Sequence, residues 1–303
     1  MAFNRQTFRI RTITTILFAV VMLAGLLWNH WSFFILFSVI HFGCWVEYQK
    51  LAGLIDKEYL QITPFHKYGV MLAGWCLMLW FTDDAYTIFG LRLHELGWWM
   101  GLICLFLLPI NELLFARHIY LKNIGYSALG LLYISLSLGL MMDLRREYFL
   151  TATHSASPIA PPWHLMIMPC IIIFSIWIND TLAYLVGSLI GKTPLTTISP
   201  KKTWEGTIGG IVLTIIITGI IAWQFNFDTR NVIIISAIAA ITGTFGDILE
   251  SKLKRLAGVK DTGSLFPGHG GFLDRFDSLL VAIPFVWIVY TGAHYLFNYD
   301  LVN

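Results

Sequence analysis

The chain has 303 residues, of which 57% are hydrophobic and 13% are charged. Its mean hydropathy is +0.70, whereas soluble domains carry about 25% charged residues. The composition therefore excludes an ordinary soluble protein and indicates one that crosses a membrane several times. A net charge of +2 is too small to favour a nucleic acid as partner. The four cysteines lie far apart within apolar runs, which does not indicate a disulfide framework or a thiolate metal site.

The apolar runs predict an all-α, polytopic integral membrane protein with about nine transmembrane helices. A span needs roughly 17–25 apolar residues. Runs of about this kind lie near 13–28, 31–50, 66–82, 96–116, 124–142, 164–189, 206–224, 231–250 and 278–298. Three arginines precede the first run, as in a signal peptide, but no small-residue cleavage site follows it. We therefore interpret it as a retained helix.

Basic residues predict the orientation, because Lys and Arg concentrate in cytoplasmic loops. With the N-terminus inside, sixteen of the 20 basic residues fall on the cytoplasmic side. We predict an N-terminal five-helix region at 1–142, an extracytoplasmic linker loop at 143–163, and a C-terminal catalytic region at 164–303 with cytoplasmic loops at 190–205 and 251–277. The chain shows no obvious transit segment, so we expect a bacterial cytoplasmic membrane and an active site that faces the cytoplasm.

Ionisable residues at membrane depth are costly and tend to be functional. Glu47 and Glu112 lie near helix ends, and we expect them to be interfacial residues paired with Lys50 and Arg117. Asp180 comes after a long apolar run, where a carboxylate needs a partner, a proton or a metal. A buried hydrogen bond that holds two helices together is the alternative there.

A polar stretch at 251–277, SKLKRLAGVKDTGSLFPGHGGFLDRFD, lies between two apolar segments. Its glycines would let backbone N–H groups approach an anion. If its end is helical, Asp274 and Asp277 share a face, and Asp247 could add a third carboxylate from the preceding helix. Such oxygens suit Mg²⁺, which usually takes one or two carboxylates, water and phosphate oxygens. For Asp247, a salt-bridged helix end is the alternative.

The basic residues of the same stretch fit phosphate recognition, because Arg holds phosphate oxygens bidentately and Lys acts as a point charge. A single Lys is explained equally well by positive-inside bias and snorkelling. The combination of acids, bases and glycines favours phosphoryl or nucleotidyl transfer, in which positioning, Mg²⁺ and cationic side chains supply most of the stabilisation.

The spacing of residues across 251–277 resembles the motif of the phosphatidate cytidylyltransferases, the CDP-diacylglycerol synthases. The stretch SPKKTWEGTIGG at 199–210 and the segment NDTLAY at 179–184 also resemble that family. Leu182 departs from the common pattern, which has a small residue at this position. The similarity covers about 179–285, and the first five helices match only in number and apolarity.

The resemblance implies a transferase of phospholipid biosynthesis that converts CTP and phosphatidate into CDP-diacylglycerol and pyrophosphate. It further implies Mg²⁺, in some members with a second, monovalent cation such as K⁺, and a homodimer. The predicted metal ligands are Asp247, Asp274 and Asp277. The predicted substrate contacts are Asp180, Lys201, Lys202, Lys254, Arg255, Lys260, Gly270 and Gly271. The predicted catalytic residues are Asp247, Lys254, Arg255, Lys260, Asp261, His269, Asp274, Arg275 and Asp277.

A phosphate monoester has its second pKa near about 6 and is mostly dianionic at neutral pH, so the reaction needs no strong general base. For His269, phosphate binding and packing within the glycine-rich turn are equal alternatives. Two other functions stay open at this stage. One is a CTP-dependent enzyme acting on an ether lipid or polyprenol, such as a CDP-archaeol synthase or a polyprenol kinase. The other is an ion-coupled transporter that uses Asp180 and Asp247.

Overall fold

The computed structural model describes residues 5–116, 120–145, 164–263 and 270–298. Each of the nine predicted apolar runs lies in a helical segment, and six described helices are long and apolar enough to cross a membrane. The helices are α1 (Arg5–Leu27), α2 (His30–Ile55), α3 (Pro64–Trp80), α4 (Leu93–Phe115), α5 (Leu121–Gly130), α6 (Ser137–Asp143), α7 (His164–Ile190), α8 (Trp204–Gln224), α9 (Thr229–Leu256) and α10 (Leu273–Asn298). The all-α membrane architecture is therefore confirmed.

Short elements complete the described chain. The 3₁₀ helix η1 (Lys57–Gln61) follows α2, and the π-helix η2 (Leu131–Leu136) joins α5 to α6. The strands β1 (Thr87–Ile88) and β2 (Leu91–Arg92) form an antiparallel hairpin before α4. Its two-residue turn has positive φ at both positions, 50° at Phe89 and 83° at Gly90, as tight hairpin turns require.

The chain divides into two compact units, which do not follow chain order. The first unit comprises 1–143 and 252–276, and the second comprises 144–251 and 277–303. Helices α9 and α10 each contribute residues to both units. In the predicted linker at 143–163, residues 146–163 lie outside the described part of the chain.

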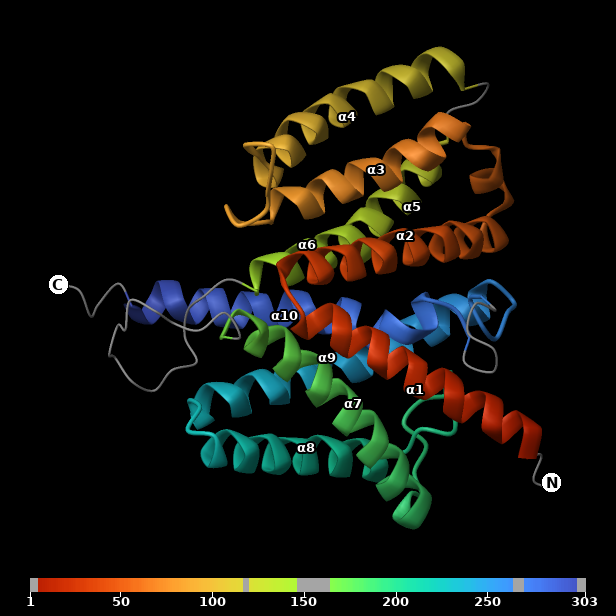
Figure 1. The fold of residues 1–303 in the computed structure, drawn as a ribbon. Coiled ribbons are helices and arrows are strands. Elements are labelled where there is room, and N and C mark those ends of the chain that lie inside the picture. Colours follow the sequence, from red (N-terminus) through yellow and green to blue (C-terminus); the bar gives the residue numbers. More distant parts are fainter. Residues whose placement is uncertain (1–4, 117–119, 146–163, 264–269, 299–303) are drawn as a thin grey trace. The chain divides into compact units, whose positions relative to one another are not determined.

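Within the first unit, α3 packs along α4, and the segment from α5 to α6 packs against α2 and α3 (Figure 1). Polar side chains contact one another between these helices, although His41 Nδ1 has no hydrogen-bond partner within the described residues. Ser135 in η2 accepts a hydrogen bond from Trp45 Nε1 at 2.9 Å, and its hydroxyl lies 3.0 Å from His41 Nε2. All three side chains are buried. Because burying a polar group without a hydrogen bond is costly, these contacts stabilise the packing of the helices.

Within the second unit, α7 and α8 pack closely over much of their length (Figure 1). Small residues permit this approach. A Cβ added to Gly206 would lie 2.7 Å from the carbonyl oxygen of Ala183 and 2.8 Å from Cα of Gly187. Gly210, one turn further along α8, lies equally close to Ala183. Small residues at every fourth position are a common device for bringing membrane helices together.

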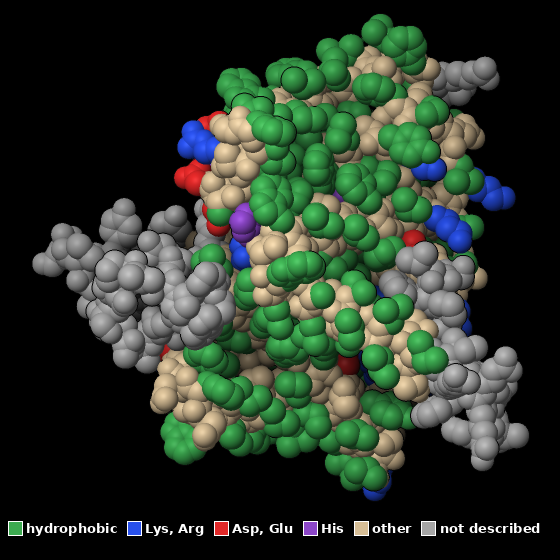
Figure 2. All heavy atoms as spheres, viewed as in Figure 1, with side chains coloured by type: hydrophobic (Ala, Val, Ile, Leu, Met, Phe, Trp, Pro, Cys, Tyr) green, Lys and Arg blue, Asp and Glu red, His purple; other side chains and the backbone are tan. Residues whose placement is uncertain are grey.

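Large hydrophobic side chains are exposed along most of the helices, for example Leu105 (65%) on α4 and Trp223 (72%) on α8. On the face shown in Figure 2, hydrophobic side chains are far more numerous than charged ones. Lipid is a favourable surrounding for such a surface and water is not. The protein is therefore a membrane protein with several spans.

Candidate active site

The loop that links α7 to α8 is folded onto the start of α8. Thr203 caps this helix by accepting a hydrogen bond from the Gly206 N–H at 3.2 Å. Glu205, in the first turn, accepts from the Thr193 hydroxyl at 2.8 Å and from the backbone N–H groups of Lys192 and Thr193 at 3.2 Å. The loop is thus fixed at both ends.

This fixed loop positions Lys202. The Leu195 N–H donates to the Lys202 carbonyl at 2.7 Å, and the Lys202 N–H donates to the Ser199 carbonyl at 3.1 Å. The Lys202 ammonium group forms an ion pair with the carboxylate of Asp247 on α9. Lys202, from the predicted stretch at 199–210, is therefore in direct contact with Asp247, a predicted metal ligand.

Two further carboxylates lie around this ion pair, and we call Asp180, Asp247 and Asp277 the carboxylate cluster. Asp180 on α7 interacts electrostatically with Lys202 and Asp247, and Asp277 on α10 interacts with both other aspartates and with Lys202. Asp247 also accepts a hydrogen bond from the Ser251 hydroxyl at 3.3 Å. Three helices and one loop of the second unit thus converge on one acidic site.

Close backbone packing brings α9 and α10 together at the cluster. A Cβ added to Gly246 would collide with the backbone of Asp277 and Ser278. Asp277 itself is 8% exposed, and its carboxylate accepts from the Ser278 N–H at 2.6 Å. Only glycine at 246 allows α10 to lie this near to Asp247.

The donor set suits a hard divalent cation. If ionised, the cluster's three carboxylates against the one ammonium group of Lys202 leave two negative charges in excess. Asn179 precedes Asp180 in α7 and is 2% exposed. Its side-chain amide contacts Thr244 on α9, and its side-chain oxygen has no hydrogen-bond partner within the described part of the chain. Unpaired buried oxygens and excess acid are costly without a cation, so the residues fit Mg²⁺, which needs only one or two carboxylates from the protein.

Among the described residues, no group of three or more His, Cys, Asp or Glu side chains is placed so that it could hold a metal ion by itself. The predicted triad of Asp247, Asp274 and Asp277 is divided between the two units. Asp247 and Asp277 lie in the carboxylate cluster, and Asp274 has partners of its own in the first unit. A shared metal role for all three remains a prediction.

Asp274, in the first turn of α10, is held by Lys254 and by two backbone N–H groups. Lys254 Nζ lies 2.7 Å from Oδ1, while Oδ2 accepts from the Thr262 N–H at 2.9 Å and the Gly271 N–H at 2.7 Å. The Thr262 hydroxyl lies 2.8 Å from Oδ2, and it can donate its one proton to Asp274 or to Glu47. The Lys254 and Asp274 side chains are 14% and 8% exposed. A buried, charge-assisted arrangement of this kind fixes Thr262 and Gly271 to the start of α10.

Glu47 on α2 is a member of this group that the sequence did not reveal. It is 8% exposed, and its Oε2 accepts from the Thr262 hydroxyl at 2.6 Å and from the Leu273 N–H at 2.9 Å. The expected pairing with Lys50 is therefore wrong, since the carboxylate is turned toward the loop. We call Glu47, Lys254, Thr262 and Asp274 the loop anchor.

Two glycines leave space for the carboxylates of the loop anchor. A Cβ at Gly271 would overlap the Glu47 carboxylate, and one at Gly270 would overlap that of Asp274. Gly270 also has φ +83°, a conformation that other residues rarely adopt. The predicted role of these glycines was anion binding, and the structure shows in addition that each makes room for a carboxylate.

The remaining predicted site residues that the structure describes are more exposed to the surroundings than Asp274 and Asp277. Arg255 lies in the last turn of α9, which continues to Leu256, beyond its predicted end at 250, and its guanidinium donates to the Val259 carbonyl at 3.4 Å. The other exposed predicted residues are Lys201, Lys260, Asp261 and Arg275. His269 lies outside the described residues.

Comparison with known proteins identifies the family of the chain. Residues 9–292 match the cytidylyltransferase family. The chain belongs to this family. It is 32% identical over 223 residues to the phosphatidate cytidylyltransferase of Bacillus subtilis, covering 70% of this chain and 76% of that protein. It is 30% identical over 256 residues to that of Haemophilus influenzae, covering 80% and 82%.

A plant relative is more similar over a shorter stretch. The chain is 45% identical over 123 residues to phosphatidate cytidylyltransferase 4, chloroplastic, of Arabidopsis thaliana, covering 39% of this chain and 31% of that protein. This match and two matches to Staphylococcus proteins span less than half of each relative's length. The carboxylate cluster and the loop anchor of this cytidylyltransferase family member both lie within the family match.

Proposed function

We propose that the protein is a CTP-dependent phosphatidate cytidylyltransferase that forms CDP-diacylglycerol and pyrophosphate. The observation that carries the proposal is the carboxylate cluster with Lys202, because it joins two separate family-like stretches in one charged site. Relatives with matches over most of their length bear the name of this activity.

In the proposed reaction, a phosphate oxygen of phosphatidate attacks the α-phosphorus of CTP. A new P–O bond forms, the bond from the α-phosphorus to the pyrophosphate oxygen breaks, and pyrophosphate leaves with the electron pair. A bound Mg²⁺ would neutralise charge on the phosphate oxygens. Asp247 and Asp277 are the residues that would hold it, with Asp180 and the oxygen of Asn179 nearby.

The protein's own residues position the phosphates. Lys202 is fixed by its loop, so its ammonium group can attract phosphate oxygens without a large cost in side-chain entropy. Lys201, next to it, is exposed and available to the nucleotide. Lys254, Arg255, Lys260 and Arg275 remain predicted phosphate contacts. Lys254 is already paired with Asp274, which favours a positioning role for this lysine.

We further propose a multi-pass protein of the cytoplasmic membrane with its active site toward the cytoplasm, where CTP is present. The acyl chains of phosphatidate would then remain in the bilayer while the head group enters the site. A homodimer, and a monovalent cation such as K⁺ beside Mg²⁺, are part of the same proposal. These rest on the family resemblance and on the distribution of basic residues.

The test is conversion of phosphatidate to CDP-diacylglycerol by the purified full-length protein in detergent, with CTP and either Mg²⁺ or EDTA. The expected result is turnover with Mg²⁺ that EDTA abolishes and that added Mg²⁺ restores. Turnover that continues in EDTA would contradict the metal assignment. Consumption of CTP only with an ether lipid or a polyprenol would contradict the choice of phosphatidate.

A further inference from the structure

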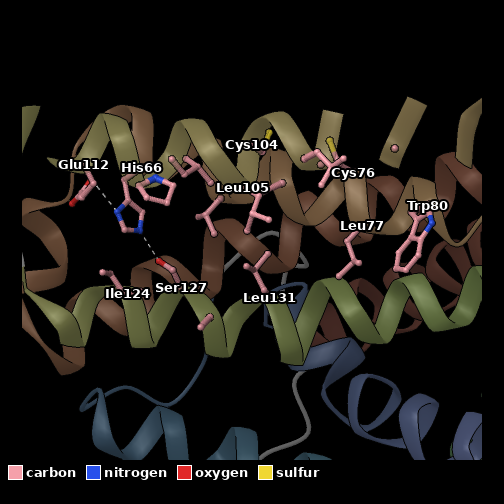
Figure 3. Close-up of a pocket in the computed structure, with 18 of the residues that line it drawn as sticks. His66, Cys76, Leu77, Trp80, Cys104, Leu105, Glu112, Ile124, Ser127 and Leu131 are labelled. Carbon is pink, nitrogen blue, oxygen red and sulfur yellow. Dashed lines mark hydrogen bonds and ion pairs between the residues drawn. The ribbon is translucent and has the colours of Figure 1, made fainter. Parts of the chain in front are cut away.

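The first unit contains an elongated pocket of about 500 Å³ between α3, α4 and α5 (Figure 3). Ligand pockets in proteins measure about 300–1,000 Å³ and are mostly apolar with a few polar groups. None of the residues around this pocket belongs to the carboxylate cluster or the loop anchor. The pocket therefore needs an explanation separate from the proposed cytidylyl transfer.

One end of the pocket is polar. His66 Nδ1 lies 3.2 Å from Glu112 Oε2, and His66 Nε2 lies 2.8 Å from the Ser127 hydroxyl. Thr63 also donates to Glu112 Oε2, at 3.3 Å. Glu112 thus pairs with His66, whereas we expected Arg117, which lies outside the described residues. Figure 3 shows His66 reaching from its helix toward Glu112 on one side and Ser127 on the other.

The other end is aromatic. Trp80 and Trp98 line it, with ring centroids 5.4 Å apart. From His66 to Trp80, α3 rises about 21 Å at 1.5 Å per residue. Between the two ends the walls are apolar, with residues such as Val70, Leu105 and Leu131. The shape and lining are those of a site for one extended hydrocarbon chain.

The pocket opens to the outside of the helices. Four of its lining residues are 45% to 65% exposed, namely Trp80, Trp98, Leu105 and Ile124. Since α4 and the segment from α5 to α6 are long and apolar enough to cross a membrane, lipid is the favourable surrounding for this opening. A chain can therefore enter from the bilayer at little cost in hydrophobic free energy.

The polar end selects the head group. Among the described residues, both side-chain contacts to Glu112 fall on Oε2, so Oε1 can accept a hydrogen bond. Within the described part of the chain, no Lys or Arg lines the pocket, and its one basic side chain at this end, His66, already contacts Glu112. A phosphate or carboxylate would therefore face Glu112 without a described basic partner of its own. A neutral hydroxyl group can donate to Glu112 and accept from the Ser127 hydroxyl, which also lines the pocket.

We propose that this pocket binds a neutral, hydroxyl-bearing lipid through a single long chain, with monoacylglycerols and long-chain alcohols as the ligand class. The hydroxyl lies at His66, Glu112 and Ser127, and the chain runs toward Trp80 and Trp98. The site is independent of CTP and of the carboxylate cluster.

The test uses a photoactivatable monoacylglycerol with a diazirine in its chain, added to the full-length protein in vesicles without CTP. Labelled peptides are expected from α3, α4 and α5, and unlabelled monoacylglycerol should displace the probe. Ala128→Trp fills the pocket from α5 and should remove most of the labelling. Leu129→Trp is the matched control, because Leu129 is exposed on the same helix and does not line the pocket.

A second variant tests the head group. Glu112→Gln should weaken competition by monoacylglycerol about tenfold, the usual effect of losing one hydrogen bond to a charged group. Equal labelling of wild type and a folded Ala128→Trp variant would overturn the pocket assignment. Stronger competition by a fatty acid, an alkylamine or phosphatidate of equal chain length would overturn the hydroxyl assignment. Because binding is measured without CTP, failure here leaves the cytidylyltransferase proposal unaffected.

Discussion

At the scale of single residues, the structure separates two kinds of aspartate that look alike in the sequence. Asp247 lies in a cluster of carboxylates with Lys202 as its cation, and Asp274 is enclosed by backbone donors and Lys254. The first arrangement retains excess negative charge and can take up a metal. The second is internally satisfied and supports a loop.

Asp247→Asn removes one negative charge from the carboxylate cluster while keeping the side chain's shape. We expect cytidylyl transfer to fall about hundredfold or more, because electrostatic stabilisation is usually the largest catalytic contribution. The rate of CDP-diacylglycerol formation at saturating CTP and Mg²⁺ measures it. Asp84→Asn, at a site 76% exposed in the first unit, is the control. If Asp247→Asn turned over at the wild-type rate, Asp247 would not be a functional residue of the active site.

Glu47→Ala tests the loop anchor. The change leaves the buried Leu273 N–H without its acceptor, while the Thr262 hydroxyl can still donate to Asp274 Oδ2. Loss of the acceptor lowers the unfolding free energy by about 1–3 kcal/mol. Thermal unfolding in detergent should show a clear decrease in midpoint. Glu95→Ala removes a carboxylate from an exposed pair with Arg92 and should change the midpoint little. Equal midpoints for both variants would show that Glu47 does not anchor the loop.

At the scale of elements, hydrophobic runs were sufficient to predict the helices, because a segment of this length and apolarity has few other stable states in a bilayer. They did not predict that α9 continues to Leu256, since its final turns are polar. Nor did they predict the partners of Glu47, which lie 215 and 226 residues away in the chain. Such pairings depend on how the helices pack, and the local sequence around Glu47 does not predict that packing.

The contact of α7 with α8 is set by backbone approach at Gly206 and Gly210. Gly206→Val should push the helices apart and displace the loop that carries Lys202, with a loss of about 1–3 kcal/mol typical of overpacking. Both the unfolding midpoint and the transfer rate should fall. Gly125→Ala on α5 is the control, because a Cβ there meets nothing within 4 Å and alanine favours a helix. An unfolding midpoint in Gly206→Val that equals that of Gly125→Ala would contradict the close packing.

At the scale of the whole molecule, composition predicted a membrane protein and the motif predicted the cytidylyltransferase family, and both predictions are confirmed. The grouping of site residues was only partly predictable. Asp180 was assigned to substrate binding from the sequence, and the structure places it with Asp247 and Asp277. Three separate helices supply these residues, so their proximity follows from the packing of helices in the second unit.

The predicted orientation can be measured with engineered cysteines. Thr197→Cys lies in the loop before α8, and Asp84→Cys lies just before the β1–β2 hairpin. Both native side chains are exposed. An impermeant maleimide should label Asp84→Cys in intact cells and Thr197→Cys only after permeabilisation. The unmodified protein, whose four cysteines are buried or half-buried, is the control. The reverse pattern would invert the topology and place the carboxylate cluster on the other side.

The most direct test of the central claim follows the two ends of the triphosphate. The purified protein is incubated with phosphatidate, Mg²⁺ and CTP labelled at either the α- or the γ-phosphorus. We predict that the α-label appears in the lipid and the γ-label in pyrophosphate, in equal amounts, and that EDTA prevents both. Transfer of the γ-label to the lipid would identify a kinase, and no transfer of either label would contradict the account of this site.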